Sequence, residues 1–159
     1  QIMSVNVKGV FLGLRHVLPV MIRQKTGAVV NTASVAGLVG NPGMPAYSAS
    51  KHAVIGLTKS ASGEVAREGV RINAVCPGPV DTRMIHAVQA QLDPADPAGA
   101  EARYQAALPT GRYTTPEEIA NMVVFLCSDL ASNTTGGQFV VDSGRTATGG
   151  AATVSAKKR

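Results

Sequence analysis

The chain has 159 residues, of which 45% are hydrophobic and 16% are charged, so it is long enough for one domain with a buried core. Its formal charge of +5 comes from Lys and Arg residues scattered along the chain, without the basic stripe and interleaved aromatic residues that favour nucleic-acid binding. No signal peptide is visible and no uninterrupted apolar run reaches membrane-spanning length, so we expect a cytoplasmic protein.

The first half of the chain predicts two helices around a strand. The segment up to about residue 25 has helix-periodic apolar residues, and Pro19 predicts a bend late in it. This pattern is already under way at Gln1 and has no capping residue, so we expect further residues upstream in the natural protein. Residues 28–32 are few and apolar, which predicts a buried strand. A loop rich in Gly and Pro then leads to a long helix over residues 47–67.

The second half predicts two more strands and a third clear helix. Residues 70–75 read as a strand that a Pro-Gly-Pro turn ends. In residues 83–113 prolines separate short helical pieces, which is more typical of a mobile loop or lid than of a core element. The sequence Thr-Pro-Glu-Glu at 115–118 has the residue order of a capping box and predicts a helix start. Residues 138–142 predict the last strand, and the composition from residue 146 predicts a disordered tail.

The alternation of helix and strand predicts an α/β fold with a parallel sheet covered by helices. Three strands alone make a poor sheet of this kind, so upstream strands are expected as well. The two cysteines, Cys76 and Cys127, lie in apolar runs, and we expect buried, reduced thiols rather than a disulfide. Their spacing is not that of a zinc site, so no metal site is expected.

Chemically useful side chains follow the predicted strands. Ser34 comes just after the first strand, and the loop 77–82 follows the second. Tyr47 and Lys51 are four residues apart at the start of a predicted helix, so they share one helix face. Loops at the carboxyl ends of parallel strands meet at one edge of the sheet, where α/β proteins bind their ligands.

This set of side chains suits the interconversion of an alcohol and a carbonyl. A free tyrosine phenol titrates near pH 10, too high to exchange protons readily near neutrality. An adjacent ammonium favours the phenolate, so Lys51 would make Tyr47 a usable proton donor and acceptor. Ser34 could hold a substrate oxygen by a hydrogen bond. A Tyr-x-x-x-Lys pair taken alone, however, is more typical of an exposed helix surface than of a catalytic site.

Several ordered motifs together resemble the short-chain dehydrogenase/reductase family. They are NTASVAG at 31–37, YSASK at 47–51 and NAVCPGPVDT at 73–82, with Ser34 thirteen residues before Tyr47. Asn6 is similar to the asparagine that this family carries in the preceding helix. The resemblance runs from about residue 6 to residue 145 and implies the C-terminal part of a doubly wound, three-layer Rossmann-like fold.

The resemblance also implies roles for individual residues. Tyr47 would be the catalytic acid/base, Ser34 would orient the substrate, and Asn6 would hold a water of the proton relay. Lys51 would support the tyrosine and bind the nicotinamide ribose. The cofactor, NAD or NADP, would bind to Tyr47 and Lys51 and would contact the loop after the second strand. The expected cofactor-binding residues are therefore Tyr47, Lys51, Pro77, Gly78, Val80 and Thr82.

The expected protein is thus an NAD(P)-dependent oxidoreductase acting on a secondary alcohol or ketone, and a homodimer or homotetramer, with neither nucleic acid nor membrane as partner. The family's Gly-rich turn, which receives the cofactor pyrophosphate, is absent. Residues 1–145 would therefore be the C-terminal catalytic part of one nucleotide-binding domain whose first half precedes Gln1. The alternative is an inactive fragment or pseudoenzyme that acts only as an oligomerisation scaffold, which long helices with several apolar faces would suit.

Overall fold

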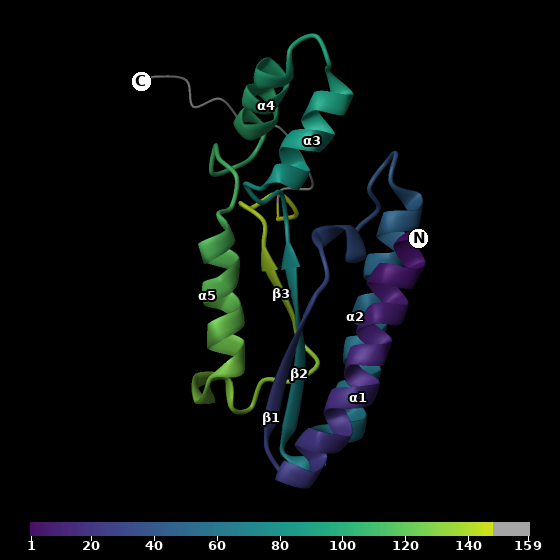
Figure 1. The fold of residues 1–159 in the computed structure, drawn as a ribbon. Coiled ribbons are helices and arrows are strands. Elements are labelled where there is room, and N and C mark those ends of the chain that lie inside the picture. Colours follow the sequence, from purple (N-terminus) through teal and green to yellow (C-terminus); the bar gives the residue numbers. More distant parts are fainter. Residues whose placement is uncertain (148–159) are drawn as a thin grey trace.

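A three-stranded parallel sheet forms the centre of the computed structural model, which describes residues 1–147. The strands are β1 (Gly27–Thr32), β2 (Val70–Pro77) and β3 (Gln138–Val141), in the order β1-β2-β3 (Figure 1). β2 pairs with both neighbours and its interior is buried, because helices cover both faces of the sheet. The predicted strands are therefore confirmed to within two residues at each end.

Helices form a layer on each side of this sheet. α1 (Gly9–Gln24) and α2 (Pro45–Val65) lie on one face, and α5 (Pro116–Cys127) lies on the other (Figure 1). The result is the three-layer α/β arrangement that the alternation of apolar patterns predicts. Three short 3₁₀ turns complete the connections: η2 (Val35–Gly37), η3 (Ala66–Glu68) and η4 (Asp129–Ala131).

The first predicted helix has an additional feature at its start. A π-helical turn, η1 (Ser4–Lys8), continues directly into α1. The sequence did not predict this turn, because one wide turn shifts the apolar periodicity too little to be recognised. Pro19 lies inside α1, and Lys25 ends the helix in the left-handed conformation with φ 56°.

By length and composition, the segment Ser4–Gln24 could cross a membrane, contrary to the expectation that no segment of this kind exists. Only 6% of its most apolar window is buried in the structure. Core helices of water-soluble proteins and signal sequences meet the same criterion, so the finding carries little weight by itself. Within this fold the segment packs along α2 and the sheet.

The apolar core lies mainly between the sheet and the α1–α2 layer. Cys76 belongs to it and is fully buried, as expected. Cys127 is also a free thiol but is exposed, so its predicted burial is wrong. It is the last residue of α5 and follows the fully buried Leu126, so it lies on a side of this amphipathic helix that faces away from the interior. The buried members of the two core clusters are Ala33, Val54, Ile55, Ala74 and Cys76 in one, and Leu14, Val65, Val70 and Ile72 in the other.

Residues 83–113 are more regular than a mobile loop. They contain two ten-residue helices, α3 (Arg83–Leu92) and α4 (Pro97–Ala106). The proline at the start of α4 takes the first helical position, and Asp96 caps the helix by accepting a hydrogen bond from the Gly99 amide at 2.9 Å. The prolines therefore separate and begin helices here, which the expectation of a loop did not take into account.

The C-terminal residues fold back as far as the structure describes them. Thr146 donates hydrogen bonds from both its amide and its hydroxyl to the Asp142 carboxylate, each at 2.7 Å. The predicted disordered tail therefore begins with an ordered residue. The rest of that predicted tail, residues 148–159, lies outside the described part of the chain.

The predicted capping box at the start of α5 is confirmed. Thr115 accepts a hydrogen bond from the Glu118 amide, and the Glu118 carboxylate accepts one from the Thr115 amide at 2.8 Å. The carboxylate also forms a two-pronged ion pair with Arg112, with distances of 2.6 and 2.9 Å. These bonds lower the pKa of Glu118 to about 2, and the hydrogen bond from Arg112 has the largest effect.

Replacing this carboxylate by an amide, Glu118→Gln, should destabilise the fold at neutral pH and not at pH 2. A lowered carboxyl pKa contributes stability above the unfolded value of 4.5, and this contribution disappears as the pH falls through about 2. The difference in unfolding temperature between wild type and variant should therefore shrink steadily from pH 5 to pH 2. A difference that does not change with pH would contradict the assigned ion pair.

Candidate active site

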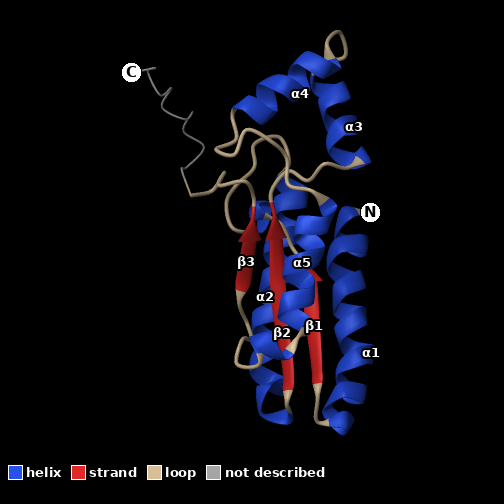
Figure 2. Ribbon diagram, turned by 90° about the vertical axis from the view of Figure 1, so that its left-hand side faces the viewer, coloured by secondary structure: helices blue, strands red, loops and turns tan. Residues whose placement is uncertain are grey.

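The predicted site residues gather at the edge of the sheet where the strands end. β1 and β2 are parallel, so their carboxyl ends point the same way, and α2 begins at the same edge (Figure 2). Ser34 lies two residues beyond the end of β1, and Pro77 is the last residue of β2. Tyr47 and Lys51 lie in the first two turns of α2.

Ser34 is held between the ends of the two strands. Its hydroxyl accepts a hydrogen bond from the Ala36 amide at 3.1 Å and so caps η2. The same hydroxyl donates to the carbonyl of Pro77 at 3.4 Å. The side chain is largely buried, with 9% of the residue exposed, so its position is set by both strands.

Gly37 brings η2 into direct contact with α2. A Cβ atom at this position would lie 2.7 Å from the carbonyl oxygen of Lys51 and 2.9 Å from a methyl group of Ile55. The oxygen belongs to the helix backbone and cannot move aside cheaply. The absence of a side chain at Gly37 therefore sets how closely the Ser34 turn approaches the helix that carries Tyr47 and Lys51.

The Tyr47–Lys51 pair has the geometry expected for one helix face. The Lys51 ammonium lies 5.6 Å from the centre of the Tyr47 ring. It donates a hydrogen bond at 2.9 Å to the carbonyl of Thr32, the last residue of β1. Burial lowers the pKa of Lys51 from its ordinary value, and the nearby Cys76 offsets part of this effect. The ammonium is therefore fixed between the tyrosine and the end of the strand.

Asn6 reaches the same helix through a residue that sequence reasoning missed. Its amide nitrogen donates to the Ser50 hydroxyl at 3.0 Å, and this hydroxyl donates to the Tyr47 carbonyl at 2.7 Å. Ser50 follows Tyr47 by three residues, so helical spacing alone could have placed it beside the tyrosine on the inner side of α2. The Asn6 side chain thus lies next to the Tyr47–Lys51 turn, and its hydrogen bond is to Ser50.

The loop after β2 is fixed mainly by the neighbouring strand. The Gly78 amide donates to the Val141 carbonyl at 2.9 Å, and a Cβ atom on Gly78 would lie 2.7 Å from the Cα of Asp142. Val80 forms a parallel bridge with Thr114, and the Thr82 hydroxyl donates to the Val80 carbonyl at 3.2 Å. Gly78 therefore serves close packing, whereas Thr82 is exposed at the start of α3.

The α3–α4 hairpin stands beyond the carboxyl ends of the strands, next to this loop (Figure 2). His86 on α3 lies between the loop before this helix and the neighbouring helix α4. Its Nε2 atom is 2.8 Å from an oxygen of Asp81, and its Nδ1 atom is 3.4 Å from an oxygen of Glu101 on α4. Tyr113 is buried under the hairpin, and this burial raises its pKa to about 12. Tyr113 therefore stays a neutral phenol near neutral pH.

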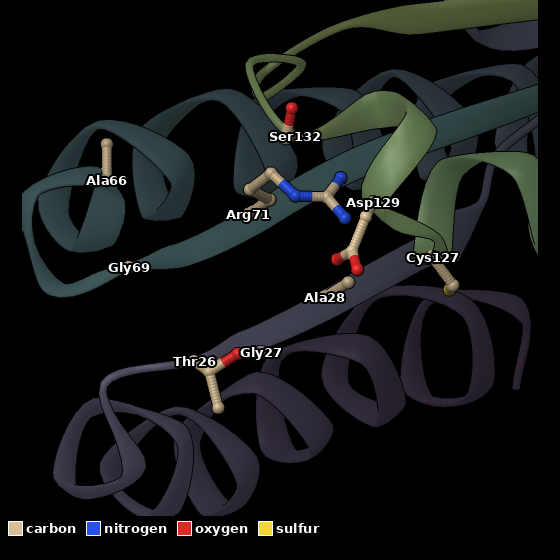
Figure 3. Close-up of a pocket in the computed structure, with 9 residues that line it drawn as sticks. All are labelled: Thr26, Gly27, Ala28, Ala66, Gly69, Arg71, Cys127, Asp129 and Ser132. Carbon is tan, nitrogen blue, oxygen red and sulfur yellow. The ribbon is translucent and has the colours of Figure 1, made fainter.

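A pocket of about 400 Å³ lies at the other end of the sheet (Figure 3). It is formed by the starts of β1 and β2 and by the end of α5, including Cys127 and Asp129. The Arg71 guanidinium in its wall donates to the carbonyls of Leu126 and Ser128, at 2.7 and 3.0 Å. Arg71 thus provides hydrogen-bond donors for backbone carbonyls at the end of α5. This pocket is separate from the candidate active site. Within residues 1–147, no group of three or more potential metal ligands is found.

Comparison with known proteins shows which family this chain belongs to. The profile described as Enoyl-(Acyl carrier protein) reductase matches residues 1–146. The chain belongs to the short-chain dehydrogenase/reductase family. It is 43% identical to levodione reductase from Leifsonia aquatica over 147 residues, or 92% of this chain and 55% of that protein. The crystal structure of levodione reductase superposes with a TM-score of 0.88 over 91% of this chain and 56% of the other.

Two further similarities bear on activity and cofactor. The chain is 47% identical to inactive 2-(S)-hydroxypropyl-CoM dehydrogenase 2 from Xanthobacter autotrophicus, over 92% of this chain and 63% of that protein. A crystal structure from Beutenbergia cavernae with bound NADP has a TM-score of 0.81 and 37% identity, over 91% of this chain and 56% of the other. This dehydrogenase/reductase chain therefore spans little more than half the length of the relatives it matches.

A single added methyl group should reveal the contact between η2 and α2. Gly37→Ala should destabilise this dehydrogenase/reductase chain by about 1–3 kcal/mol, because the new Cβ atom meets the backbone of Lys51. Gly40→Ala, three residues later in open space, is the matched control and should leave stability almost unchanged. Chemical denaturation of both variants measures the difference, and equal midpoints would contradict the contact.

Proposed function

We propose that the natural protein containing this chain transfers hydride between a nicotinamide cofactor and a secondary alcohol or ketone. Residues 1–145 supply the C-terminal catalytic part of its single nucleotide-binding domain. The observation that carries the proposal is the meeting of Tyr47, Lys51 and Ser34 at the carboxyl edge of a parallel sheet. Family membership supports an oxidoreductase, and these three side chains supply the proton chemistry that such a reaction needs.

Each side chain has one task in this reaction. The Tyr47 hydroxyl gives a proton to the carbonyl oxygen during reduction, and takes it back from the alcohol during oxidation. The Lys51 ammonium, 5.6 Å from the centre of the tyrosine ring, places a positive charge beside this proton donor. The Ser34 hydroxyl, held by the ends of β1 and β2, turns its one proton from the Pro77 carbonyl, a long contact of 3.4 Å, to the substrate oxygen and so keeps this oxygen in place.

The donor set at this edge suits the nicotinamide end of NAD or NADP. Lys51 is already fixed by the Thr32 carbonyl and can also donate to a ribose hydroxyl, as can Tyr47. The loop containing Pro77, Gly78 and Val80, followed by the exposed Thr82, provides backbone groups and a hydroxyl beside them. When bound, the cofactor supplies or accepts the hydride. The crystal structures of two relatives contain NADP, which supports this class of cofactor.

A second candidate is a scaffold without catalysis. One of the most similar relatives is itself named inactive, so membership of the family does not decide activity. Exposed apolar side chains lie on α1, for example Phe11 and Val20, and on α5, for example Val124 and Phe125. A homodimer or homotetramer that covers these surfaces would suit either candidate.

Removing the phenolic oxygen should separate proton transfer from binding. In the natural protein that contains this chain, Tyr47→Phe should lower kcat by at least about a thousandfold, because the acid/base group is lost. Cofactor affinity, measured by fluorescence titration with NADH and NADPH, should change by less than about fivefold. Kinetics like those of the wild type in this variant would overturn the assignment of Tyr47.

Cofactor titration combined with size-exclusion chromatography separates the two candidates. The enzyme should bind NAD(H) or NADP(H) with micromolar affinity and turn over a panel of secondary alcohols and ketones. A scaffold should assemble into the same oligomer yet show no saturable cofactor signal up to millimolar concentrations. The second result would replace the oxidoreductase proposal by the scaffold.

A further inference from the structure

We propose that Ser50 is a positioning residue for Tyr47: it ties the first turn of α2 to the π-helical turn η1 through Asn6. This inference rests on the proposed function of Tyr47 as the acid/base. Its basis is a pair of consecutive hydrogen bonds. The side-chain amide of Asn6 donates to the Ser50 hydroxyl, and this hydroxyl donates to the backbone carbonyl of Tyr47.

The first turn of α2 needs such support. Met44 at its N-cap makes no side-chain hydrogen bond to the helix, and Pro45 has no amide proton to offer. The first amides of a helix have no partner within the helix, and an uncapped end frays. Tyr47 lies in this turn, so an acid/base that must be positioned to within about 0.5 Å is carried by a turn that no side chain caps.

Ser50 supplies an anchor that a cap would otherwise provide. The residue has no exposed surface, and its hydroxyl uses its single proton on the Tyr47 carbonyl while accepting from Asn6. A serine bond to the carbonyl three residues earlier is local and would move with the helix. The bond from Asn6 comes from another element, 44 residues away in the chain, and therefore fixes the turn in space.

The π turn accounts for the position of Asn6. η1 contains Asn6 at its middle, and a π turn widens the helix by one residue, which turns its side chains relative to the α-helix that follows. η1 packs against α2. Asn6 is half-buried at this contact, so its amide meets Ser50 away from bulk water, where the hydrogen bond is worth more.

The same turn offers a matched control. Ser48 is also buried, with 8% exposed, yet its hydroxyl oxygen has no hydrogen-bond partner within the described part of the chain. Ser48→Ala therefore removes the same atom from the same turn of α2 without breaking a link to η1. Ser50→Ala removes the link, and Asn6→Ala removes it from the other side.

Hydrogen exchange tests the link directly. Ser50→Ala and Asn6→Ala should each raise the exchange rates of the amides of residues 48–51 roughly five- to tenfold, since one buried hydrogen bond to this turn is lost. Ser48→Ala should change these rates by less than about twofold. Should Ser50→Ala fail to fold, Asn6→Ala, at a half-buried position, gives the same information. Unchanged exchange in both link variants would overturn the proposal.

Kinetics test the consequence for Tyr47. In the natural protein that contains this chain, Ser50→Ala should lower kcat roughly tenfold while KM for the cofactor changes by less than about twofold, because orientation is lost and binding is not. The double variant Asn6→Ala/Ser50→Ala should be no slower than Ser50→Ala alone, as expected for residues that act as one unit.

The outcomes separate this inference from the proposed function. Faster exchange together with a wild-type kcat in Ser50→Ala would show that the turn is tied down but that Tyr47 does not depend on it, which overturns the positioning role. A kcat loss of the same size in Ser48→Ala would also overturn it. Absence of turnover in the wild type would count against the proposed function instead, and a positioning role in catalysis would fall with it.

Discussion

The structure depends most on the close approach of η2 to α2 at Gly37. Backbone meets backbone there, so the turn that carries Ser34 and the helix that carries Tyr47 and Lys51 behave as one rigid unit. The ammonium of Lys51 adds a second tie by bonding to the end of β1. The Ser34 hydroxyl and the Lys51 ammonium are thus oriented by the same few contacts that hold the layers together, and the link from Asn6 to Ser50 adds a contact for the turn that carries the phenol.

The central strand β2 extends this unit to the rest of the fold. Its end carries the carbonyl that accepts from Ser34, and the next residue, Gly78, packs on the backbone of Asp142 after β3. The α3–α4 hairpin is attached to the same loop through His86 and Asp81. A displacement of β2 would therefore move the Ser34 hydroxyl and the α3–α4 hairpin together.

Sequence reasoning found the parts of the fold that local chemistry dictates. Apolar periodicity predicted α1 and α2, and the capping box at Thr115 predicted the start of α5, because each signal lies within a few residues. The π turn escaped it because one wide turn barely shifts the apolar periodicity, and the exposure of Cys127 escaped it because an apolar run does not show which side of a helix faces outward. The link from Asn6 to Ser50 escaped it because it joins residues 44 positions apart. The site residues could be named from motif spacing, but that Asn6 meets Ser50 could only be seen in three dimensions.

The order of the sheet determines which strands have a free edge in the described part of the chain. Within residues 1–147, β1 is an edge strand, because only β2 pairs with it. An open edge offers a row of unsatisfied amides and carbonyls that can template another strand. If an added strand slipped by one residue against β1, its own apolar side chains would turn to the opposite face of the sheet, so its apolar pattern fixes its register. A strand of this kind would extend the sheet from β1 through backbone hydrogen bonds alone, without any contribution from Ser34, Tyr47 or Lys51.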